Sequence, residues 1–147
     1  MLGVGSAKTN MDTMHKLSTK YMDTIRQFIK FLLVGVLNTL VGLSIIYSLM
    51  YFLGVGPFLS NLLGYAVGIV VSYNLNKIWT FNSSKAARRS FPRFVLVVAV
   101  AYIANIFMVY VSVINFRIDP YVSQLIGLAF YTVLVYAGSR KLVFQSA

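Results

Sequence analysis

The sequence predicts an all-α integral membrane protein whose four transmembrane helices form two repeated hairpins. Its 147 residues are 59% hydrophobic and only 11% charged, whereas globular domains carry about 25% charged residues. Four stretches long enough to cross a bilayer contain no charged residue, and the second half of the chain echoes the first at an offset of 63 positions. A soluble domain of this size cannot bury so much apolar surface, but a lipid-facing one can expose it.

The polar segment 1–27 precedes the first apolar stretch and contains glycine, serine and several methionines. We expect it to be cytoplasmic and partly disordered, as terminal segments without apolar packing usually are. Within it, Tyr21 begins a stretch up to Lys30 that predicts an amphipathic helix on the inner membrane surface, with Ile25, Phe28 and Ile29 on its apolar side. The membrane domain is then 28–147.

The four uncharged stretches are close to the roughly 20 residues that a helix needs to cross the hydrocarbon layer. They are predicted as helices because backbone groups in lipid must form hydrogen bonds within their own segment. The first is too long for the apolar core of a signal peptide, so we expect it to be retained. The uncharged stretches are Phe31–Leu53, Phe58–Asn76, Phe94–Phe116 and Tyr121–Ser139, which gives spans at about 31–53, 58–80, 93–116 and 121–143.

The distribution of basic residues predicts the orientation, because cytoplasmic connections carry the excess of lysine and arginine. The two short connections, 54–57 and 117–120, contain one basic residue between them. We therefore expect the N-terminus, the middle connection and the C-terminus to be cytoplasmic. Basic residues of these three regions include Lys16, Lys20, Arg26 and Lys30, then Lys85, Arg88 and Arg89, and finally Arg140 and Lys141.

The internal repeat aligns more than apolar residues. Pro57 corresponds to Pro120 and Gly64 to Gly127, while basic and aromatic positions match as well. Each half is a hairpin that begins and ends on the same side, so the two repeats are parallel about an axis along the membrane normal, as in some transporters. Further matched pairs are Phe28 with Phe91, Phe31 with Phe94, Tyr73 with Tyr136, Lys77 with Arg140 and Phe81 with Phe144.

Polar residues inside the spans are few. Gly64 and Gly68 of the second span form a small-xxx-small pair that lets another helix approach closely, either from the same chain or from a second copy. Asn38 in the first span and Asn105 in the third need partners, because an amide in hydrocarbon is costly. For both amides, a hydrogen bond that only holds the bundle together and a contact with substrate remain open alternatives.

The densest polar cluster closes the second span, where Tyr73, Asn74, Asn76 and Lys77 fall within two helical turns. An interfacial anchor with a lysine that reaches the headgroups explains Lys77 but not the asparagines. A site for an anionic headgroup would use the lysine for a phosphate and the amides and phenol for sugar hydroxyls. Three further cations are expected at the same depth, where they either form a basic ring with Lys77 or only set the topology: Lys30, Arg93 and Arg140.

Several function classes lack the residues they require. The chain has no cysteine, one histidine and three aspartates at positions 12, 23 and 119. No catalytic set, metal site or cofactor is therefore expected, and a proton-coupled exporter is disfavoured because no carboxylate lies in a span. The net charge of +10 lies at the ends of apolar stretches, which indicates contact with anionic lipid and not with nucleic acid.

Three motifs in these spans resemble the GtrA-like family of polytopic membrane proteins. FLLVGVLNT at 31–39 is similar to its first-helix motif, SYNLNKIWTF at 72–81 to its motif at the end of the second helix, and RKLVF at 140–144 to its closing motif. The resemblance covers about residues 28 to 144. The chain departs from the family pattern at Tyr73, where phenylalanine is frequent, and at Ala137 and Gly138, which are less polar than the family motif.

The resemblance implies a role in the bacterial cytoplasmic membrane, in the synthesis of cell-surface polysaccharide or glycolipid. Members are thought to flip polyprenyl-phosphate-linked sugars, which membrane glycosyltransferases make on one side and use on the other. We expect no enzyme activity of the chain itself. The alternative is a non-transporting anchor of a glycosyltransferase, and a second copy of the chain is a further candidate partner. On the flippase hypothesis, Lys77, Arg93 and Arg140 hold the phosphate, aided by Lys30, while Asn38, Asn74, Asn76 and Tyr73 contact the sugar.

Overall fold

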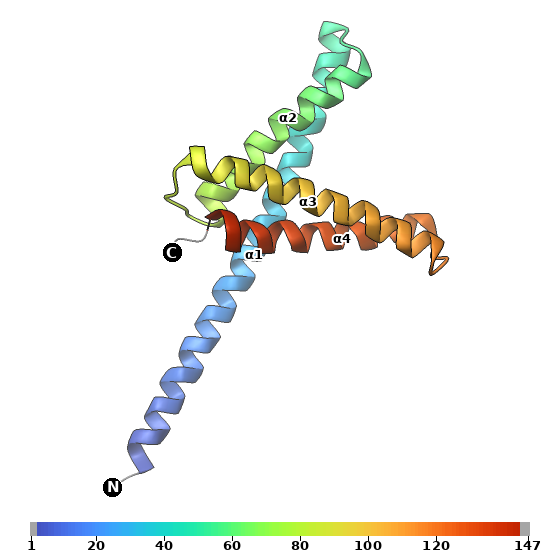
Figure 1. The fold of residues 1–147 in the computed structure, drawn as a ribbon. Coiled ribbons are helices and arrows are strands. Elements are labelled where there is room, and N and C mark those ends of the chain that lie inside the picture. The colour runs from blue at the N-terminus through green and yellow to red at the C-terminus, as the bar shows by residue number, and fades with distance from the viewer. Residues whose placement is uncertain (1–2, 145–147) are drawn as a thin grey trace.

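The computed structural model describes the backbone of residues 3–144 and the side chains of residues 13–144. Within this range the chain is helical without a strand, which confirms the predicted fold class. Four helices are long and apolar enough to cross a membrane, so the chain is a multi-pass membrane protein. The elements are α1 (Gly3–Leu53), α2 (Pro57–Leu75), the π-helical segment η1 (Asn76–Thr80), α3 (Ala87–Ile114), α4 (Pro120–Gly138) and the π-helical segment η2 (Ser139–Phe144) (Figure 1).

Local sequence explains the two tight turns between paired helices. Gly54 adopts a positive φ of 61° where α1 ends, a conformation that glycine adopts without steric cost. Pro57 and Pro120 occupy the first turns of α2 and α4, where no backbone donor is needed. Asp119 caps α4, because its Oδ1 accepts hydrogen bonds from the backbone nitrogens of Tyr121 at 2.9 Å and Val122 at 3.3 Å.

The N-terminal segment continues the first span without a break. Its backbone is helical from Gly3 onward, so Tyr21–Lys30 is part of α1. The physical reason is that no proline or glycine interrupts residues 6–34, so nothing ends the helix before the span begins. Residues 1 and 2 lie outside the described range.

The two hairpins are structural repeats as well as sequence repeats. A Cβ atom added at Gly64 would lie 2.5 Å from Cγ1 of Ile46, and one added at Gly127 would lie 2.6 Å from Cγ2 of Val109. The first contact joins α2 to α1 and the second joins α4 to α3. The corresponding residues of the two contacts are 63 positions apart in the chain. The segments η1 and η2 begin at equivalent positions too. Equivalent glycines therefore bring the helices of each hairpin into close contact.

Reciprocal contacts join one hairpin to the other. The Tyr73 hydroxyl lies 2.6 Å from the Ser90 hydroxyl, and the Tyr136 hydroxyl donates to Oε1 of Gln27 at 3.3 Å. Because Gln27 and Ser90 are themselves equivalent positions, the interface is related by a pseudo-twofold axis. The ring of Phe81 stacks on that of Phe144, its own equivalent, with centroids 5.0 Å apart and an angle of 20° between the planes.

The same symmetry extends to three pairs of ring contacts. Tyr73 contacts Phe91, Phe94 and Phe144, and Tyr136 contacts their equivalents Phe28, Phe31 and Phe81. These rings make up most of the buried core of the molecule. The core therefore sits at one end of the bundle, which we call the basic end because Lys30, Lys77, Arg93 and Arg140 lie there. Beyond it the two hairpins diverge toward their turns (Figure 1).

The close glycine contact gives a first prediction. Replacing Gly64 with alanine should lower the free energy of unfolding by about 1 to 3 kcal/mol, because the added methyl group meets Ile46 and the backbone oxygen of Gly42 at 3.2 Å. Gly35→Ala is the matched control. No atom lies within 4 Å of its added Cβ, so alanine should stabilise the helix by up to about 1 kcal/mol. Reversible unfolding in mixed micelles measures the free energy of unfolding of both variants. Equal changes in Gly64→Ala and Gly35→Ala would contradict the packing role of Gly64.

Candidate functional site

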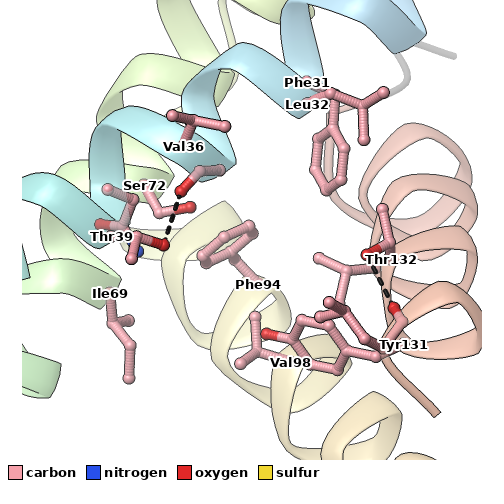
Figure 2. Close-up of a pocket in the computed structure, with 14 residues that line it drawn as sticks. Phe31, Leu32, Val36, Thr39, Ile69, Ser72, Phe94, Val98, Tyr131 and Thr132 are labelled. Carbon is pink, nitrogen blue, oxygen red and sulfur yellow. Dashed lines mark hydrogen bonds between the residues drawn. The ribbon is translucent and has the colours of Figure 1, made fainter. Parts of the chain in front are cut away.

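A cavity of about 420 Å³ lies where the two hairpins begin to diverge. In Figure 2, Thr39 and Ser72 lie on the side of the first hairpin, Tyr131 and Thr132 on the side of α4, and Phe94 of α3 between them. All four spans contribute to its wall. The lining residues are Phe31, Leu32, Gly35, Val36, Asn38, Thr39, Ile69, Ser72, Phe94, Val98, Leu128, Tyr131, Thr132 and Val135.

A second cavity of about 730 Å³ continues from the first toward the turn end of the first hairpin. It reaches Ile46 and Asn61, which lie near the turn between α1 and α2. Together the two cavities form an inter-hairpin cleft at membrane depth, with walls that are mainly apolar. The residues that line both parts are Asn38, Thr39, Ile69, Val98 and Tyr131.

Asn38 is the most distinctive polar group of the cleft. Its Oδ1 atom is buried without a hydrogen-bond partner among the residues that the structure describes. Its amide packs on Gly68, where an added Cβ atom would lie 3.3 Å from Oδ1. The absence of a side chain at Gly68 therefore makes room for the amide. A buried carbonyl oxygen without a donor costs about 1 to 3 kcal/mol, and the rest of the Asn38 side chain is partly exposed at the cavity.

The cleft hydroxyls can accept hydrogen bonds but have few other partners. The Thr39 hydroxyl donates to the Gly35 carbonyl at 3.1 Å, and that of Thr132 donates to the Leu128 carbonyl at 2.8 Å (Figure 2). Each retains acceptor capacity toward the cavity. The arrangement suits a neutral molecule with several hydroxyl groups, since no charged side chain lines either cavity.

The four predicted cations lie at the basic end but differ in their partners. Lys30 Nζ donates to the Trp79 carbonyl at 3.5 Å and lies 5.7 Å from the centroid of the Trp79 ring. Arg140 donates to the Thr24 hydroxyl at 3.3 Å and to the Tyr136 hydroxyl at 3.4 Å. The side chains of Lys77 and Arg93 have no ion pair or hydrogen bond within residues 13–144, and only the Lys77 backbone carbonyl is bonded beyond its helix, to the Ser83 nitrogen at 2.8 Å. Lys30 and Arg93 directly precede Phe31 and Phe94 in the cleft wall, so this end of the cleft is cationic.

Comparison with protein families matches residues 30–144 to the GtrA/DPMS transmembrane domain. The chain belongs to this family. The match covers all four spans and confirms the resemblance that the three motifs indicated. Comparisons with curated proteins and with solved structures each gave no match.

In this GtrA/DPMS domain the polar cluster at the end of the second span is divided between two environments. Tyr73 is only 3% exposed and lies inside the interface between the hairpins, away from the cleft wall. Asn76 is 1% exposed, and its Nδ2 donates to the Ser72 carbonyl at 2.9 Å, while its Oδ1 is buried without a partner in the described chain. Asn74 is exposed and donates to the Val70 carbonyl at 2.8 Å. Of these residues, Asn74 has the most accessible side chain.

Tyr131 and Thr132, which the fold brings into the same cavity wall as Asn38, were not among the predicted site residues. Each is a single polar side chain in an apolar helix, which is no motif. The internal repeat offered one signal for these two residues. Tyr131 and Thr132 align with the dissimilar residues Gly68 and Ile69 of the first hairpin. Asn38 likewise corresponds to Ala101. Asn105, by contrast, packs against Gly127 and lines neither cavity.

Proposed function

We propose that this GtrA/DPMS chain flips a polyprenyl-phosphate-linked sugar across the bacterial cytoplasmic membrane, for the synthesis of cell-surface polysaccharide or glycolipid. In this proposal the basic end faces the cytoplasm. The observation that carries it is the inter-hairpin cleft, which begins beside four cations and continues to membrane depth with amide and hydroxyl groups in an apolar wall. The family match supports the same class of function.

The chemistry of the cleft suits each part of such a lipid. A sugar in hydrocarbon loses its hydrogen bonds to water, and Asn38, Thr39 and Ser72 would replace some of them. The phosphate would bind Lys77 and Arg93, whose side chains have no partner in the described chain. The polyprenyl tail would remain in lipid, because the two hairpins diverge toward their turns (Figure 1) and the cleft lies between them.

The remaining predicted residues take supporting roles. Asn74 is exposed beside Lys77 and would contact the sugar at the cytoplasmic entrance. Arg140 joins η2 to α1 and Lys30 joins α1 to η1, and both add positive charge at the basic end. No step of bond making or breaking is proposed, because translocation needs only a path for the headgroup. The membrane glycosyltransferases that make and use the lipid are the proposed partners.

The test is a vesicle assay in which the purified chain transfers a fluorescent polyprenyl-phosphate sugar between leaflets. Changing Lys77→Gln and Arg93→Gln together should slow transfer at least about tenfold, because each would lose a charge-assisted hydrogen bond of about 1.5 to 3 kcal/mol. The variant should stay folded, since neither side chain has a partner in the described chain. The double variant Arg88→Gln, Arg89→Gln is the control for lost charge alone, because both residues are exposed in the first turn of α3.

Two results would count against the proposal. Equal transfer by the test and control variants would show that Lys77 and Arg93 do not bind the phosphate. A chain that transfers no lipid alone but co-purifies with a glycosyltransferase would instead support the anchoring role.

A further inference from the structure

The part of α1 that precedes the span, residues 13–30, has two chemically different faces. At about 100° per residue, its apolar side chains occupy an arc of about 140° around the helix axis. Six of them are 47% to 70% exposed, although a stripe of this size is rarely left in water. They are Met14, Leu17, Tyr21, Met22, Ile25 and Ile29.

This apolar stripe is in register partly with the lipid-facing side of the same helix and partly with the wall of the cleft. Residues 18 positions apart in a straight α-helix are separated by five full turns and point the same way. Met22 is thus aligned with Leu40 and Ile29 with Tyr47, which are 57% and 65% exposed and line neither cavity. The other four residues of the stripe are aligned with residues of the cleft wall.

The opposite face of the segment is polar and basic. It is in register with a buried side of α1 at one position, since Lys16 is aligned with Val34, which is fully buried. Four cations and one acid lie on residues 13–30, which gives a net charge of +3 with neutral histidine. The cations are Lys16, Lys20, Arg26 and Lys30, and the acid is Asp23.

Contacts with the second hairpin hold the helix from Thr24 onward. Arg140 donates to the Thr24 hydroxyl and the Tyr136 hydroxyl donates to the Thr24 carbonyl, both at 3.3 Å. The Thr24 hydroxyl also donates to the Lys20 carbonyl at 2.9 Å. Threonine hydroxyls bonded to the preceding turn favour bending of a helix. A bend is therefore favoured between Lys20 and Thr24, next to the point where the bundle no longer holds α1.

We propose that the part of the apolar stripe that precedes this bend, from Met14 to Met22, docks on the anionic headgroup layer of the membrane that α1 enters. The bend lets residues 13–22 lie along the bilayer surface, with the apolar stripe toward the lipid and the basic face in water and among the headgroups. Apolar burial and attraction of the cations to anionic lipid stabilise this position.

A second copy of the chain is a less favourable occupant of the stripe. Pairing two such segments would bring two sets of like charges together, each with a net charge of +3. An anionic bilayer surface has the complementary charge and is adjacent to the segment in any multi-pass arrangement.

The test uses fluorescence of the full chain in vesicles. Trp79 is the single tryptophan, so a Trp79→Phe background allows one new reporter at a time. Leu17→Trp places it on the apolar stripe and Thr19→Trp on the polar face. In vesicles with phosphatidylglycerol, Leu17→Trp should emit at shorter wavelength and be quenched several-fold more strongly than Thr19→Trp by lipids brominated on the acyl chain. The difference should shrink in pure phosphatidylcholine and at high salt.

Equal quenching at the two positions would overturn the proposal. A blue shift of Leu17→Trp that depends on the ratio of protein to lipid, and not on lipid charge, would overturn it in favour of a second copy. These readouts do not involve lipid transfer, so they are independent of the proposed flippase activity.

Discussion

Replacing Phe144 with alanine is expected to separate the two hairpins while leaving each one helical. The Phe144 ring is 3% exposed and contacts Phe81, Tyr73 and Phe94, which come from both halves of the chain. Truncation of a buried phenylalanine costs about 3 to 5 kcal/mol, and we expect the lower end, because a lipid environment gives less hydrophobic driving force than water. The contacts of Tyr73 with Phe91 and Ser90, and of Tyr136 with Phe28 and Gln27, would remain and hold the hairpins more loosely.

The measurement is the distance between spin labels at the two turns, together with the free energy of unfolding in mixed micelles. Phe144→Ala should broaden the distance distribution and leave the circular dichroism signal of helix almost unchanged. Phe116→Ala is the control, because that ring is 71% exposed near the turn of the second hairpin. A narrow, unchanged distribution in Phe144→Ala would refute the role of the stacked pair.

Asn38→Ala is expected to change stability and transport in opposite directions. The buried Oδ1 has no partner among the described residues, so its removal should leave the free energy of unfolding unchanged or raise it by about 1 kcal/mol. Alanine fits this position of the scaffold, since the equivalent residue of the second hairpin is Ala101, which is 1% exposed. Lipid transfer should fall at least about tenfold, as expected for one lost hydrogen bond to a sugar in the cleft.

A matched control for Asn38→Ala is Ser44→Ala on the same helix. Ser44 is exposed, its hydroxyl donates to the Leu40 carbonyl at 2.8 Å, and it lines neither cavity. The rate of lipid transfer should be unaffected in Ser44→Ala. A loss of stability in Asn38→Ala would instead assign the amide to bundle packing, which is the alternative that the sequence left open.

The helices and the repeat could be predicted because both depend on local pattern. Uncharged stretches of about 20 residues must become helices in lipid, so the four spans needed no tertiary information. The matched prolines, glycines and aromatic residues indicated two hairpins, and the reciprocal contacts of Tyr73 and Tyr136 have this symmetry. No helix-breaking residue separates the first span from the segment before it, and α1 continues through both.

The candidate site was predicted only in part. Clustering in sequence grouped Tyr73, Asn74, Asn76 and Lys77, but residues of adjacent helical turns can point to different surroundings. Tyr73 faces the second hairpin, where its hydroxyl meets Ser90, while Asn74 faces outward. Tyr131 and Thr132 join Asn38 only through the crossing of two hairpins, which no sequence spacing reports.

By itself, the sequence determined that this protein is a four-helix membrane protein with an internal repeat and a cationic end, because hydropathy, charge and alignment act along the chain. The tertiary structure decided which of the polar residues share a space. Aromatic rings hold the hairpins together at the basic end, and divergence beyond them creates a cleft at Asn38. Which side chains line such a cleft depends on the angle at which two hairpins cross, and that angle is set by contacts between residues far apart in the chain.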